Sequence, residues 1–103
     1  MDRIEKLREL RIQQPDDNFL KHALALELIK IGEDKSAREL FESIIENDPS
    51  YVGSYYHLGK LLERIGENTL AEQIYEKGIS ECIKINDRHA LSELRGAYDD
   101  LTT

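Results

Sequence analysis

The chain has 103 residues and a formal net charge of −7, from 14 Lys and Arg against 21 Asp and Glu. That charge repels nucleic acid duplexes and anionic lipid surfaces on average, and no cluster of Lys and Arg interleaved with aromatic residues offsets it. We therefore expect no nucleic acid and no membrane as a partner. Hydrophobic residues make up 40% of the sequence, which is enough for one small domain with its own core.

The sequence lacks the marks of a membrane or secreted protein. No apolar run approaches the roughly 20 residues that a membrane span needs. The start, MDRIEKLREL, is charged and amphipathic, unlike a signal peptide. Cys82 is the single cysteine, so an internal disulfide is impossible. These features predict a cytoplasmic location.

Apolar residues recur at helical spacing along the chain, and turn residues divide it into helices. The first predicted helix ends before Pro15, because proline disfavours helical backbone in the residue before it. Gly32 and Gly66 close two others, because glycine takes a left-handed cap at little steric cost. The predicted helices cover residues 2–12, 18–31, 34–46, 52–65, 68–85 and 88–101. No segment alternates with period two and no long linker divides the chain, so we predict a single all-α domain over residues 1–103.

One sequence pattern occurs twice in the chain. KIGEDKSARELF at residues 30–41 and RIGENTLAEQIY at residues 64–75 lie 34 residues apart and share Ile-Gly-Glu, a following Ala and a following aromatic residue. The same register divides the chain into units 18–51 and 52–85. A fixed period of this size is typical of a solenoid, in which each helical hairpin buries its apolar face on its neighbours.

The second unit reads Tyr55-x-x-Leu58-Gly59-x-x-Leu62, followed by Ala71 and Tyr75. The first unit reads Lys21-x-x-Leu24-Ala25-x-x-Leu28, followed by Ala37, Phe41 and Pro49. This pattern resembles the tetratricopeptide repeat. The resemblance implies a right-handed α-α superhelix of about six antiparallel helices. It also implies that residues 2–14 form the second helix of a half-repeat and that residues 87–101 form a capping helix.

Each slot of the repeat has a physical reason. Small residues such as Ala37 and Ala71 are expected where the two helices of a hairpin cross. Phe41 and Tyr75 are expected to fill the space between one hairpin and the next. Lys21 departs from the pattern, because the family places a large apolar side chain in that slot.

Signs of catalysis or cofactor binding are few. His22, His57 and His89 are separated by nearly one repeat, so neighbouring helices could bring them together as metal ligands or bases. The alternative, which we favour, is that they are polar surface residues on the first helix of each hairpin, which by the resemblance lines a concave groove. Zinc needs three or four ligands at short local spacings, which the sequence lacks. Cys82 has no CxxC partner and is expected to be a packed thiol. We predict no enzyme activity, no metal and no cofactor.

The resemblance implies a function instead. In this family the first helix of each hairpin lines a concave groove that holds a peptide or a helix of another protein. The groove positions it implies here are Phe19, His22, Leu26, Ile29, Lys30, Gly53, Tyr56, Lys60, Glu63, Arg64, Ala90, Leu94 and Tyr98. The family's carboxylate clamp needs Lys and Asn in slots that hold other residues here, so that activity is not implied.

Two questions stay open in the sequence. Leu26 and Ile29 lie opposite the core stripe of their helix, so either the last helix covers them through Leu94 and Tyr98 or they form an exposed patch for a partner. The predicted function is a non-catalytic module that binds a protein or peptide partner, as a monomer or weak homodimer. The alternative is a self-associating structural unit that forms a homodimer through its terminal helices.

Overall fold

The computed structural model describes residues 2–103, and over that range the chain folds into six α-helices without a β-strand. The helices are α1 (Arg3–Gln13), α2 (Asn18–Lys30), α3 (Asp34–Asn47), α4 (Gly53–Arg64), α5 (Asn68–Ile85) and α6 (Arg88–Thr102). The predicted helices agree with these bounds to within one residue, and the all-α prediction is confirmed. No helix within residues 2–103 is both long and apolar enough to cross a membrane.

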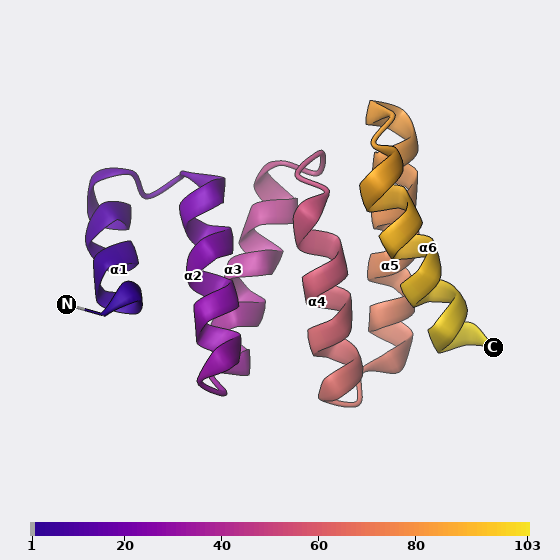
Figure 1. The fold of residues 1–103 in the computed structure, drawn as a ribbon, viewed down its shortest axis with the longest axis horizontal. Helices are drawn as coiled ribbons and strands as arrows, with labels where there is room; N and C mark the ends of the chain where they lie inside the picture. Colours follow the sequence, from indigo (N-terminus) through magenta and orange to yellow (C-terminus); the bar gives the residue numbers. More distant parts are fainter. Residues whose placement is uncertain (1) are drawn as a thin grey trace.

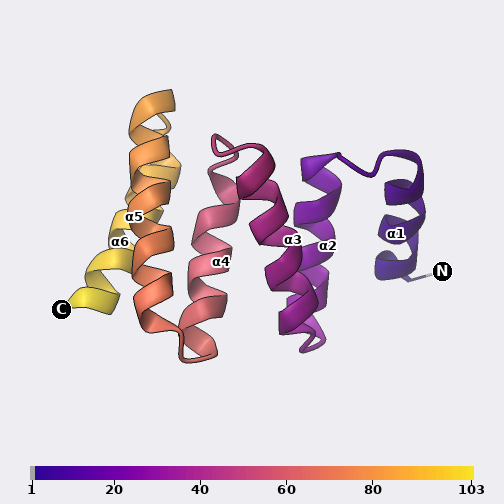
Figure 2. The ribbon, with the colours of Figure 1, turned by 180° about the vertical axis from the view of Figure 1, so that it is seen from behind.

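The helices stand side by side in a row, with α1 at one end and the pair α5 and α6 at the other (Figure 1). The row measures 43 × 29 × 19 Å, and the two ends of the chain lie at opposite ends of it. Helices α2, α4 and α6 lie on the face seen in Figure 1, whereas α3 and α5 lie on the face seen in Figure 2. The first helices of both hairpins therefore share one face of the molecule.

The two hairpin turns have the same backbone. Gly32 and Gly66 take left-handed φ angles of 80° and 86°. In each turn the amide of the next residue donates back to the helix, from Glu33 to the Leu28 carbonyl at 2.9 Å and from Glu67 to the Leu62 carbonyl at 2.8 Å. These bonds satisfy carbonyls that the helix end would otherwise leave unpaired.

Aspartate side chains begin three of the helices. Asp2, Asp17 and Asp87 each accept a hydrogen bond from a backbone amide in the first turn of α1, α2 and α6, at 2.8 to 3.0 Å. An N-cap carboxylate pairs a free amide and opposes the positive end of the helix dipole. The sequence placed the start of α2 at this acidic turn for the same reason.

The small residues of the repeat are buried where the helices cross. Ala25, Ala37 and Ala71 have no exposed surface. Gly59 lies against the ring of Tyr75, so close that a Cβ atom at residue 59 would stand 2.1 Å from a ring carbon. Tyr75 therefore packs inside its own hairpin, where its hydroxyl donates a hydrogen bond to the Glu63 carboxylate, rather than only between hairpins as expected. Phe41 does reach the next hairpin, since its ring stacks on His57 of α4.

Lys21 occupies its apolar slot in an unexpected way. The side chain is only 4% exposed, and its ammonium group donates to the Ser43 hydroxyl of α3 at 3.1 Å. The long aliphatic stem thus fills the space of an apolar side chain, while the hydroxyl accepts a hydrogen bond from the buried ammonium group.

Candidate functional site

A groove of about 510 Å³ opens between the face of α2, the start of α1 and the middle of α4. Its lining is Arg3 from α1, His57 from α4, and Phe19, His22, Ala23, Leu26, Glu27, Ile29 and Lys30 from α2. The α2 residues recur at steps of three and four, so they share one face of that helix. This is the face opposite the core stripe of Leu24 and Leu28.

The apolar part of the groove is accessible to solvent. Phe19 is 67% exposed at the start of α2, whereas Leu26 and Ile29 are half-buried further along it. Ala23 forms a buried floor between them. Side chains of this kind, arranged as a concave strip, suit the apolar face of another polypeptide.

An ion triad stands at the mouth of the groove. The Glu27 carboxylate forms ion pairs with the Arg3 guanidinium at 2.8 Å and with the Lys30 ammonium at 3.3 Å. Both cations are largely exposed, so solvent screens the pairs and their contribution to stability is small. The Arg3 contact nevertheless joins α1 to α2 across the groove.

Two histidines from different helices meet at the inner wall. The ring centroids of His22 and His57 are 5.4 Å apart. His22 Nδ1 lies 2.9 Å from the hydroxyl of Ser54, which is fully buried. Burial, and to a smaller extent the neighbouring His57, lowers the pKa of His22 to about 4. Burial also lowers the pKa of His57, against an opposing effect of the Glu93 carboxylate.

Aromatic rings hold this histidine pair in place. Phe41 meets the edge of the His22 ring, with centroids 5.5 Å apart, and lies nearly parallel to His57 at 6.2 Å. The Tyr51 ring lies 5.8 Å from His22. The pair therefore sits on the packed interface between the two hairpins rather than on flexible surface.

The predicted residues of α4 lie beside the groove and do not line it. The Lys60 ammonium is 5.9 Å from the centre of the Tyr56 ring and 3.8 Å from the Glu63 carboxylate. Arg64 pairs with Asp34 of α3 at 2.8 Å, which links the tips of the two hairpins. Lys60 and Arg64, both predicted groove positions, each pair with a different carboxylate of the chain.

The assignment of Leu94 to the groove surface needs correction. Leu94 is 1% exposed and packs against Gly78, where an added Cβ atom would stand 2.8 Å from it. Tyr98 is half-buried on the same helix. Helix α6 packs on α5 and α4, so it shields the last hairpin and leaves the strip of Leu26 and Ile29 open in the groove.

Sequence reasoning missed four of the lining residues: Arg3, Ala23, Glu27 and His57. Ala23 and Glu27 lie one helical turn from predicted positions, so extending the stripe by steps of four would have found them. His57 was considered as a metal ligand or base and as a polar residue on a groove-lining helix, but it was not among the predicted groove positions. Nothing in the sequence around Arg3 predicted its place in the groove, because only the packing of α1 on α2 brings it there.

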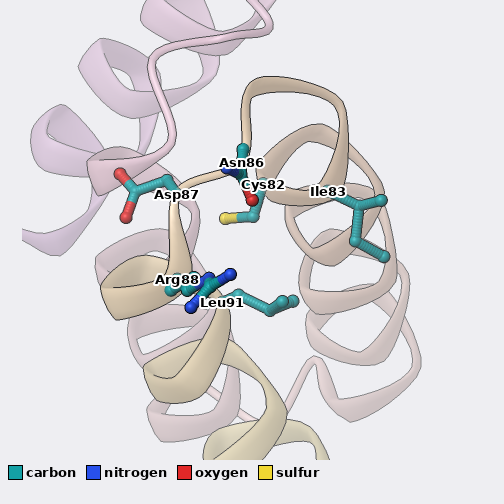
Figure 3. A pocket seen from close by; sticks show the side chains of 6 residues that line it. All are labelled: Cys82, Ile83, Asn86, Asp87, Arg88 and Leu91. Carbon is teal, nitrogen blue, oxygen red and sulfur yellow. The ribbon is translucent and has the colours of Figure 1, made fainter.

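A second, smaller pocket of about 200 Å³ lies where α5 turns into α6. It is lined by Cys82, Ile83, Asn86, Asp87, Arg88 and Leu91 (Figure 3). The Cys82 thiol is buried, and burial raises its pKa, which disfavours the reactive thiolate. His89 of α6 is exposed beside Glu93 and does not join the other two histidines. Within residues 2–103 no three His, Cys, Asp or Glu side chains group as a metal site would need.

Comparison with known proteins agrees with this architecture. The pattern of the Tetratricopeptide repeat matches residues 52–88. A TPR repeat-containing protein of Pseudomonas aeruginosa is 26% identical over 91 residues, which are 88% of this chain and 87% of that protein. The TPR2B domain of yeast Sti1, solved in a complex with pHsp70, has the same fold, with a TM-score of 0.88 and 18% identity over 96% of this chain and 79% of that one.

A tetratricopeptide repeat domain protein of Salinibacter ruber is more similar in sequence. It is 41% identical to this chain over 85% of this chain and 89% of that one, and its structure superposes with a TM-score of 0.81. Identity at this level over most of both chains extends the match well beyond the second repeat. The chain belongs to the tetratricopeptide repeat family.

Proposed function

We propose that the protein is a non-catalytic interaction module whose groove between α1, α2 and α4 binds a peptide or a helix of a partner protein. In this proposal residues 18–51 and 52–85 are the two repeats, residues 2–14 are the half-repeat helix, and residues 87–101 are the cap. The proposal includes a cytoplasmic location, with which the free thiol of Cys82 is compatible.

The observation that carries the proposal is the open apolar strip of the groove. Phe19 presents most of its ring to solvent, and Leu26 and Ile29 continue the strip along α2. Aromatic side chains dominate the energetics of protein interfaces, so Phe19 is the strongest candidate anchor. The Sti1 domain, which has the same fold, was solved in a complex with pHsp70, and this supports a protein as the partner.

Capture of partners from a lysate of the source organism tests the proposal. Immobilised wild-type protein and the Phe19→Ala variant are compared, and captured proteins are identified by mass spectrometry. We expect Phe19→Ala to weaken binding about tenfold or more, because removing a large aromatic anchor costs about 1–2 kcal/mol or more at an interface. Helicity and melting temperature should stay nearly unchanged, since the ring is 67% exposed.

Ile83→Ala is the matched control. Ile83 is also a large apolar side chain, 57% exposed, but it lies on α5 beside the second pocket. The Ile83→Ala variant should capture the same proteins as the wild type. Equal capture by all three proteins would contradict the groove as the binding site. Capture of further copies of the chain, with a dimer in gel filtration, would favour self-association through terminal helices instead.

A further inference from the structure

The inner wall of the groove joins two kinds of surface. Beside the apolar strip of Phe19, Leu26 and Ile29 stand the imidazoles of His22 and His57. His22 is fixed on one side by the Ser54 hydroxyl, and Phe41 packs against both rings. The imidazoles are therefore placed where an inserted side chain of a partner would cover them.

The charged groups around the pair come from several helices. Arg3 of α1 and Lys30 of α2 are occupied by the Glu27 carboxylate at the mouth. On α4, Lys60 is near Glu63, and on α6 Glu93 raises the pKa of His57. Tyr51 adds a phenol close to His22. Among residues 2–103, no carboxylate forms an ion pair with either imidazole. Glu93 is therefore a carboxylate that favours the charged form of His57, but burial has the larger effect and lowers the pKa of that imidazole overall.

We propose that the groove accepts an uncharged apolar side chain of the partner against the His22–His57 pair, so that the complex forms with both imidazoles neutral and dissociates on acidification. The charge pattern supports this occupant, because the cations at the mouth already share a carboxylate and the inner wall is neutral at pH 7. The inference rests on the proposed function and adds the chemistry of the occupant and its dependence on pH.

The sign of the pH dependence follows from linkage. An apolar group that covers the imidazoles removes more water from them, so protonation becomes harder in the complex than in the free protein. Above pH 6.5 both histidines are neutral in both states, and affinity does not change with pH. Below it the free protein takes up protons that the complex excludes, at His57, whose pKa is lowered by burial, and at His22, whose pKa is about 4. Affinity therefore falls by up to about tenfold per pH unit for each imidazole.

A carboxylate in the same place would have the opposite effect. It would raise the pKa of both histidines and draw protons into the complex. Affinity would then rise as the pH falls. The direction of the pH dependence thus distinguishes an apolar occupant from an acidic one.

A displayed library of random 12-residue peptides provides the probe. Peptides are selected on the wild-type protein at pH 7.5, and those that lose binding to Phe19→Ala but not to Ile83→Ala are synthesised. Their dissociation constants are measured at pH 7.5, 6.5, 5.5 and 5.0. The imidazole Cε1 protons of free and bound protein are followed by NMR over the same range, and circular dichroism confirms folding at each pH.

We expect the dissociation constant to rise as the pH falls from 6.5 to 5.0, with the pKa of His57 lower in the complex than in the free protein. His57→Gln should flatten this dependence, whereas His89→Gln, which alters an exposed histidine of α6, should leave it unchanged. Groove-bound peptides whose affinity is constant or improves on acidification would overturn this inference and leave the proposed function intact. A library that yields no peptide sensitive to Phe19→Ala would overturn the proposed function itself, and the inference with it.

Discussion

Gly59 and Gly96 are both helical glycines, but their surroundings differ completely. A Cβ atom at residue 59 would lie 2.1 Å from the Tyr75 ring, whereas one at residue 96 would meet nothing within 4 Å. The ring cannot move away freely, because its hydroxyl is held by Glu63 and the side chain is fully buried. Glycine is therefore required by packing at residue 59, whereas at residue 96 it only lowers the stability of the helix.

We expect Gly59→Ala to lower the free energy of unfolding by about 1–3 kcal/mol, since overpacking a crossing forces side chains out of place. Gly96→Ala should instead raise it by about 0.5–1 kcal/mol, because alanine loses less backbone entropy in a helix. Urea denaturation followed by circular dichroism measures both. An equal effect of the two substitutions would show that Tyr75 does not constrain the crossing.

At the scale of elements, three helices end in the same left-handed turn. Gly32, Gly66 and Asn86 have φ angles of 80°, 86° and 60°. After Asn86 the Asp87 amide donates to the Cys82 carbonyl at 3.0 Å, which repeats the bond pattern of the two glycine turns. Asparagine tolerates this backbone better than most residues, so α5 can end without a glycine.

The left-handed backbone of these turns predicts stability effects that do not depend on side-chain packing. Gly66→Ala should lower stability by about 1–2 kcal/mol through backbone strain alone, since a Cβ atom there meets nothing within 4 Å. Asn86→Gly should change stability by no more than a few tenths of a kcal/mol, because the backbone is already left-handed. Thermal unfolding compares the variants, and a loss on Asn86→Gly as large as that of Gly66→Ala would contradict the shared turn.

At the scale of the whole molecule, the protein is a row in which each helix depends on its neighbours. Helix α6 covers the apolar side of α4 and α5 through Leu94 and Ala97. At the other end, α1 packs on α2 through Leu7. Stability in such a row is a sum of local terms, so damage at one end should be felt most by its neighbours.

Leu94→Ala should lower stability by about 2–4 kcal/mol, since it removes a fully buried leucine from the α5–α6 contact. Amide hydrogen exchange should then show the greatest loss of protection in α5 and α6, and less in α2 and α3. Leu101→Ala is a control on the same helix, because Leu101 is only half-buried. Uniform loss of protection along the chain would contradict the picture of a row with local stability.

Much of the candidate site follows from the helical face of α2. Phe19, His22, Leu26 and Ile29 were predicted, and the structure places all four in the groove. The predicted α4 and α6 positions agree less well with the groove. The repeat pattern predicts which face of a helix a residue lies on, but not whether a neighbouring helix covers that face. Leu94 shows this, since the repeat pattern predicts it in the groove but it packs against Gly78 and belongs to the core.

The sequence by itself determined the helices, their turns and the period of the repeat, because backbone preferences and apolar spacing act within a few residues. It could not determine contacts between residues far apart in the chain. The burial of Lys21 on Ser43, the Arg3–Glu27 pair and the meeting of His22 with His57 each join two helices. Only the tertiary structure decided them, because they depend on the distance and angle at which neighbouring helices pack.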